Sequence, residues 1–211
     1  WYNTLITTNI DIIMLQDSGA EHLSFFTLDE REAFFKAFAN ACSKAQKELW
    51  INVESAQVEA RDWDNALEME RTNQKDWTFT EMEWLAQKFD LAAKYGKKIV
   101  NWGYYPMMNP AEILSGMTVE DIDLQQIDQS KRKENYEAYK NYIETLPTEI
   151  PAGRLTQPRI NGTLWYLAGN TYMLNETELK AAIRKDIEYQ RNAGFDILWL
   201  VNTSAYFQKI K

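Results

Sequence analysis

Two acidic residues stand at the ends of apolar runs, where they could act together on a sugar linkage. Asp17 ends the run "IDIIMLQD" and Glu54 ends the run "LWINVE". If these runs are neighbouring strands, strand spacing puts their ends about 5 Å apart before side-chain reach is added. Such a pair can hydrolyse a glycosidic bond: one carboxylate stays ionised, while the other donates a proton because burial and its neighbour's charge raise its pKa. We therefore expect Asp17 and Glu54 to be a catalytic acid pair.

Amide and aromatic side chains occupy similar strand-end positions. Amides can hydrogen-bond to sugar hydroxyls, and aromatic rings offer flat apolar faces to sugar rings. The predicted substrate-binding residues are Gln16, Asn52, Asn101, Trp102, Tyr104 and Tyr105.

Other roles for these residues stay open at this point. A strand-end carboxylate more often caps the next helix or pairs with an arginine than performs catalysis. Asp17, Glu21, His22 and Glu54 could together hold a hard cation such as calcium, although their spacing matches no recognised binding loop. The chain also has no P-loop, no G-x-S-x-G turn and no dinucleotide-binding glycine motif. We therefore expect neither a metal site nor a cofactor.

The elements that must position these residues alternate along the chain. Five short apolar runs, each a candidate strand, are separated by helical patterns. Capping boxes predict three of the helix starts, at Thr27 with Glu30, Thr80 with Glu83 and Asn175 with Glu178. Near-continuous apolar strands suit a parallel sheet, and parallel β/α folds place ligands at the carboxyl ends of the strands. We expect an α/β protein with parallel β/α units of TIM-barrel type.

Composition limits the partners of the chain. Its 211 residues are 45% hydrophobic, which is enough for one sizeable core. The net charge of -8 repels phosphate backbones and anionic lipid, so we expect no nucleic-acid partner. One cysteine and one histidine exclude an intrachain disulfide and a Cys/His zinc cluster. No run is long and apolar enough for membrane insertion.

The runs "IDIIMLQDSG", "LWINVES" and "KIVNWGYYPMMNP" resemble a bacterial family catalogued as a domain of unknown function and grouped with glycoside-hydrolase-like TIM barrels. That family carries patterns of the types Gln-Asp-x-x-Gly, Trp-x-x-x-Glu and Tyr-x-x-Tyr-Met-x-Pro, in this order, towards the end of its domain. Gln16, Asp17, Glu54, Tyr105 and Pro110 match approximately, whereas the glycine spacing after Asp17 and the second tyrosine do not. The resemblance covers residues 1–110 and implies a carbohydrate-active protein, secreted or in the cell envelope.

The order of the segments departs from that family. Residues 158–203 resemble the opening βαβ unit of the same barrel, yet they follow the closing units. We expect closing β/α units over residues 1–146, a linker over 147–158 and an opening βαβ unit over 159–211. The chain, which begins at Trp1, is then permuted, trimmed or part of something longer. Five strands fall short of the eight that close a barrel, so a homo-oligomer or a missing segment would complete it.

The leading hypothesis is a glycoside-hydrolase-like protein that hydrolyses or binds a carbohydrate through the acid pair and the aromatic platform. The first alternative is a non-catalytic carbohydrate-binding module, which keeps the aromatic platform without a working acid pair. The second is a structural barrel fragment with no ligand. Replacing Glu54 with Gln separates the first two, because only hydrolysis needs its carboxyl group.

Overall fold

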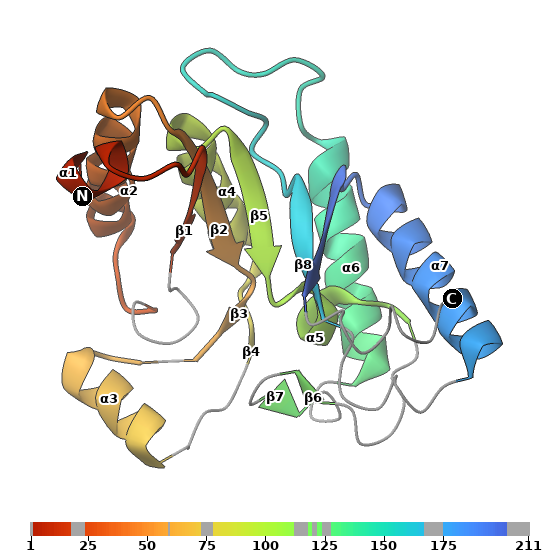
Figure 1. The fold of residues 1–211 in the computed structure, drawn as a ribbon. Helices are drawn as coiled ribbons and strands as arrows, with labels where there is room; N and C mark the ends of the chain where they lie inside the picture. The colour runs from red at the N-terminus through yellow and green to blue at the C-terminus, as the bar shows by residue number, and fades with distance from the viewer. Residues whose placement is uncertain are drawn as a thin grey trace.

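A parallel sheet of five strands organises the computed structural model, which describes residues 2–17, 24–58, 60–72, 78–111, 118–119, 122–123, 128–166 and 175–201. The strand order follows the chain: β1 (Ile12–Gln16), β2 (Glu48–Glu54), β5 (Lys98–Trp102), β8 (Gly162–Tyr166) and β9 (Ile197–Val201). Figure 1 shows these strands side by side. The α/β class with parallel strands is confirmed. Barrel closure is not shown, because β1 and β9 are the two edges of the sheet as far as the described residues go.

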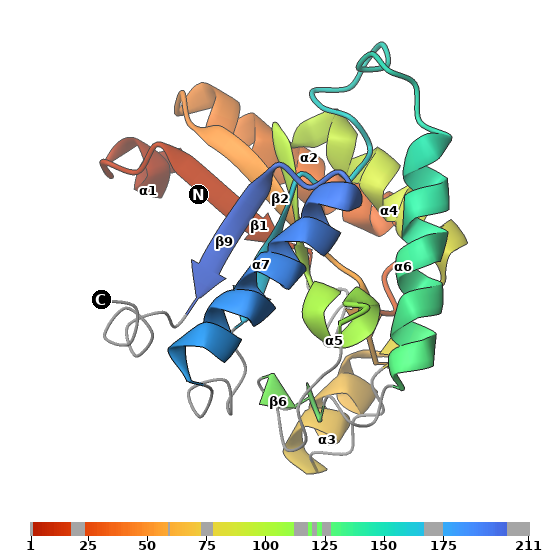
Figure 2. The ribbon, with the colours of Figure 1, turned by 90° about the vertical axis from the view of Figure 1, so that its right-hand side faces the viewer.

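Four long helices follow or link the strands. They are α2 (Leu28–Lys44), α4 (Met82–Tyr95), α6 (Gln129–Glu144) and α7 (Glu176–Asn192). α4 packs on β2 and β5 and also contacts α2 and α6. Figure 2 shows α4 and α6 on the same side of the strands. Fully buried side chains such as Phe35, Phe89 and Tyr139 fill the space between this helix layer and the sheet.

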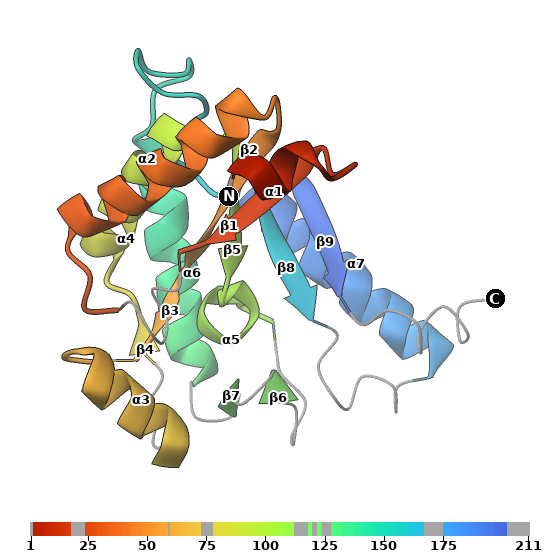
Figure 3. The ribbon, with the colours of Figure 1, turned by 60° about the vertical axis from the view of Figure 1, so that its left-hand side comes forward.

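Shorter elements complete the described chain. They are α1 (Tyr2–Ile6), β3 (Ala56–Gln57), α3 (Trp63–Thr72), β4 (Thr78–Phe79), α5 (Tyr104–Met108), β6 (Thr118–Val119) and β7 (Ile122–Asp123). β3 pairs with β4 and β6 with β7, both antiparallel. Figures 1 and 3 show α3, α5 and the two hairpins at the carboxyl end of the sheet, whereas α1 lies beside α2. The carboxyl end is therefore the one that carries inserted structure.

The helix starts confirm two of the three predicted capping boxes. Thr27 caps α2 with Glu30, and Asn175 caps α7 with Glu178. The prediction for Thr80 is wrong: α4 is preceded by Glu81, which makes no side-chain cap. The Thr80 N–H instead donates to the Ser55 carbonyl at 2.8 Å, which holds Thr80 against the end of β2. Gly96, which follows the last residue of α4, has an extended backbone with φ -98° and ψ 140°.

The two predicted units, residues 1–146 and 159–211, contribute to one sheet. β5 of the first unit pairs with β8 of the second, with Val100 opposite Gly162 and Asn101 opposite Thr163. A Cβ at Gly162 would stand 2.7 Å from the Cβ of Ile197, so the absence of a side chain there permits the approach of β9. Residues 147–158, predicted as a linker, contain no helix or strand.

Side-chain alternation defines two faces of the sheet. Along β1, Ile12, Met14 and Gln16 are exposed, whereas Leu15 is buried. Ile12 lies opposite Glu48 and Gln16 lies opposite Asn52. We call the face that carries these residues the open face, and the other face, which packs against the helix layer, the helix face. No helix in the described part of the chain is long and apolar enough to cross a membrane.

Candidate functional site

Three polar residues gather on the open face at the carboxyl ends of β1 and β2. Gln16 and Asn52 lie opposite each other in the parallel register, and Glu54 follows two residues after Asn52 on the same face. The Gln16 Nε2 donates a hydrogen bond of 2.5 Å to the Glu54 Oε1. Gln16 is exposed, whereas Glu54 is 1% exposed. The structure thus brings together three of the predicted site residues, with Gln16 nearest to solvent.

Asn52 contributes an acceptor within this group. The residue is 2% exposed, and its Oδ1 accepts no hydrogen bond from the residues that the structure describes. A hydroxyl placed at this oxygen would donate a hydrogen bond to it, so Asn52 suits a ligand that carries donor groups.

Asp17 lies on the helix face, one residue beyond Gln16. Its Oδ2 is 3.1 Å from the Lys88 Nζ and 3.4 Å from an Arg31 guanidinium nitrogen. The three side chains are at most 2% exposed, and we call Arg31, Asp17 and Lys88 the buried ion cluster. Asp17 and Glu54, the predicted acid pair, therefore direct their side chains to opposite faces of the sheet. The alternative role, pairing with an arginine, describes Asp17 better.

The two cations of the buried ion cluster were not among the predicted site residues, although their positions on the helices carry a signal in the sequence. Lys88 falls within the apolar stripe of α4, between Leu85 and Ala92. Arg31 likewise faces inward on α2, one turn before the buried Phe35. A long cation on a buried stripe needs an anionic partner, because an unpaired buried charge is very unfavourable. Burial lowers the pKa of Lys88, while the nearby Asp17 carboxylate opposes that shift.

Asn101, predicted with Asn52 to bind substrate, lies on the other face of the sheet from Asn52. Asn101 lies opposite Val53 in the register, so its side chain is on the helix face. Its Nδ2 donates to the Val53 carbonyl at 2.8 Å, and its Oδ1 accepts from the Ser55 hydroxyl at 3.3 Å. Asn101 thus ties β5 to the end of β2 and leaves no amide for a ligand on the open face.

The predicted aromatic platform is also divided. Trp102 lies opposite Glu54 on the open face, where it is 7% exposed. Tyr104 lies not at the end of the strand but at the start of α5, and it is 1% exposed. Its ring packs edge-on against the Phe195 ring, with the ring centroids 5.2 Å apart. Tyr104 is therefore a core residue. Tyr105 also lies in α5, and its side chain is outside the described part of the structure.

Metal binding gains no support from the described residues. Within the described ranges, no group of three or more His, Cys, Asp or Glu side chains could hold a metal ion. Two members of the alternative calcium set, Glu21 and His22, lie outside those ranges.

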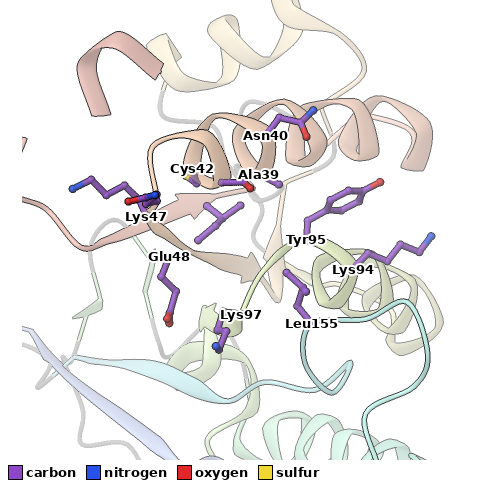
Figure 4. A pocket seen from close by; sticks show the side chains of 12 residues that line it. Ala39, Asn40, Cys42, Lys47, Glu48, Lys94, Tyr95, Lys97 and Leu155 are labelled. Atoms are coloured by element: carbon purple, nitrogen blue, oxygen red, sulfur yellow. The ribbon is translucent and has the colours of Figure 1, made fainter. Parts of the chain in front are cut away.

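A separate cavity of about 540 Å³ lies at the amino end of the sheet, between the C-terminal ends of α2 and α4. We call it the amino-end pocket, and Figure 4 shows its lining. Lys47, Lys94 and Lys97 contribute cations, and Glu48 and Tyr95 line the same cavity. Cys42 also lines it but is 1% exposed, and burial raises the pKa of its thiol. This pocket lies away from the strand ends where β/α folds bind substrates.

Comparison with known proteins adds no relative: no family model, no curated protein and no solved structure matches this chain.

Proposed function

We propose that this protein binds a neutral carbohydrate on the open face, at the carboxyl ends of β1 and β2. The observation that carries the proposal is the Gln16, Asn52 and Glu54 group, in which the Asn52 Oδ1 has no donor among the described residues. Sugar hydroxyls donate and accept hydrogen bonds, so one hydroxyl suits the Asn52 oxygen and others suit Gln16 and Glu54. Trp102, on the same face, supplies an apolar surface.

Binding is favoured over hydrolysis by the position of Asp17. Glycosidases of the usual kind need two carboxyl groups that flank the scissile bond. Glu54 faces the open side, but Asp17 is engaged by Arg31 and Lys88 on the helix face. Hydrolysis through this pair is therefore the second candidate. The family resemblance, which implies a glycoside-hydrolase-like barrel protein of the secretory route or cell envelope, belongs to the same proposal.

The first experiment measures binding directly. The full chain is titrated with neutral tetrasaccharides of glucose and xylose in several linkages, and heat and tryptophan fluorescence are recorded. We expect Asn52→Leu to weaken the affinity by about tenfold, because one hydrogen bond at a desolvated site contributes roughly 1.5 kcal/mol. Asn40→Leu, at an exposed amide near the amino-end pocket, is the matched control and should change nothing. Absence of binding by the parent, or equal losses in both variants, would refute the proposal.

The second experiment separates binding from hydrolysis. Any tetrasaccharide that binds is incubated with the parent and with Glu54→Gln, and released sugars are detected by mass spectrometry. Turnover by the parent that disappears in Glu54→Gln, with binding retained, would establish the hydrolytic candidate. Binding without released sugar in either protein supports the binding module.

A further inference from the structure

We propose that Lys88 and Asp17 are positioning residues: together they grip the backbone of Glu54 and so fix its carboxyl group on the open face. The inference rests on the proposed function only for the importance of Glu54. The contacts themselves are independent of any ligand. Asp17 was predicted to be catalytic, and Lys88 was not among the predicted site residues.

The grip involves both polar atoms of one residue's backbone. The Glu54 N–H donates to the Asp17 Oδ1 at 3.2 Å, and the Glu54 carbonyl accepts from the Lys88 Nζ at 2.8 Å. The Lys88 Nζ is also 3.1 Å from the Asp17 Oδ2. The two side chains therefore close a ring of contacts around a single backbone position, and hydrogen bonds to a charged group are stronger than those between neutral groups.

The contacts of Asp17 and Lys88 with the Glu54 backbone lie at the carboxyl end of β1. Within residues 2–17 and 24–58, the β1–β2 ladder runs as far as the bond of 3.0 Å from the Asp17 N–H to the Asn52 carbonyl. In a continued parallel ladder, the Glu54 N–H and C=O would next pair with the backbone of the neighbouring strand. Here a carboxylate and an ammonium group take those two places. The side-chain pair thus extends the hydrogen bonding of β2 by one residue beyond the end of β1.

Orientation of the carboxyl group follows from this arrangement. Glu54 is held from the helix face through its backbone, while its side chain meets Gln16 on the opposite face. Arg31 offers a useful comparison: it donates to the Asp17 backbone carbonyl at 3.2 Å and to the Asp17 Oδ2 at 3.4 Å. Both cations neutralise Asp17, and Lys88 also contacts the Glu54 backbone.

The test compares Lys88→Met with Arg31→Met in protein labelled with ¹³C and ¹⁵N at glutamate. Both variants remove one buried cation from Asp17, so both should be less stable, and spectra are recorded where each is folded. We expect Lys88→Met to shift and broaden the Glu54 amide and carboxyl signals, whereas Arg31→Met leaves them near their parent positions. Equal effects of the two variants on Glu54 would overturn the proposal.

A measurement on the parent protein covers the case in which Lys88→Met does not fold. With ¹⁵N-labelled lysine, a gripped Lys88 should give a slowly exchanging Nζ–H signal, separate from those of the surface lysines, and the Glu54 amide should exchange slowly. A Lys88 signal averaged with the others, or a rapidly exchanging Glu54 amide, would refute the grip. These readouts need no sugar, so a failed binding titration and a failed grip are distinguishable. Where a tetrasaccharide binds, Lys88→Met should weaken it about tenfold and Arg31→Met less than twofold.

Discussion

The two ends of the sheet carry lysine-containing groups that differ in burial and in what they hold. At the carboxyl end, Lys88 is 2% exposed and contacts both Asp17 and the Glu54 backbone. At the amino end, Lys94 is 33% exposed, and its distance to a Glu32 carboxylate oxygen is 3.7 Å. The Lys88 ammonium is fixed by two short contacts in a desolvated place, whereas the Lys94 ammonium remains largely hydrated.

The difference in burial distinguishes a charged side chain that fixes the position of its neighbours from one that lies at the surface. A buried ion pair gains little net stability, because desolvation offsets its attraction, but breaking it is costly. The geometry of the buried pair is therefore fixed, and it fixes the position of the Glu54 backbone, which contacts both members of the pair. An exposed ion pair costs little to break, and its geometry is not fixed. We infer that the carboxyl end is built for positioning and that the amino-end pocket is not.

The largest expected effect is the loss of the shared anion of the buried ion cluster. Asp17→Asn leaves Arg31 and Lys88 buried without their carboxylate, and we expect the free energy of unfolding to fall by about 3–5 kcal/mol. Urea denaturation followed by circular dichroism measures this change.

The matched control is Asp90→Asn. Asp90 forms a two-bond pair with Arg154, at 2.9 and 2.8 Å, but its side chain is 45% exposed. Because solvent screens this pair, we expect a loss of about 1 kcal/mol or less. If the two variants lose similar free energies, the distinction between the two kinds of ion pair does not hold for this protein.

Local sequence signals predicted the elements better than they predicted the site. Capping boxes at Thr27 and Asn175 act within one turn of chain, so they could be read from sequence. Thr80 carries the same pattern, but the pairing of β4 with β3 brings its N–H to the Ser55 carbonyl, and this long-range contact prevails. No local sequence pattern predicts this contact.

The predicted site residues were chosen because they stand at strand ends. In the structure they point to two different faces of the sheet. Asn52 and Glu54 share a face because they are two residues apart, whereas Asn101 and Trp102 are adjacent and cannot share one. That much was available from the sequence. The pairing of Lys88 with Asp17 was not, because it depends on how α4 packs against the end of β1.

The pH dependence of stability gives an intermediate effect. Burial lowers the pKa of Lys88 below its ordinary value of 10.5. Between the lowered pKa and 10.5, the unfolded chain binds more protons at this site than the folded protein, so the contribution of Lys88 to stability rises with pH.

We therefore expect the stability difference between the parent and Lys88→Met to increase as pH rises from neutral towards 10.5. Urea denaturation of both proteins across this range is the measurement, and the comparison cancels titrations that the two proteins share. Parallel stability curves would mean that Lys88 titrates alike in the folded and unfolded states.

The smallest expected effect is at the amino-end pocket. Lys94→Met removes an ion pair that is about one-third exposed on both sides, and we expect a change in unfolding free energy under about 0.5 kcal/mol. Glu32 keeps its hydrogen bond of 2.8 Å from the Tyr95 hydroxyl, which is also the main cause of the lowered pKa of Glu32. Thermal unfolding at low and high salt checks this, because screening should erase what difference there is. A loss comparable to that of Asp17→Asn would make the amino end a second place where a lysine holds the fold, and the contrast between the two ends would fail.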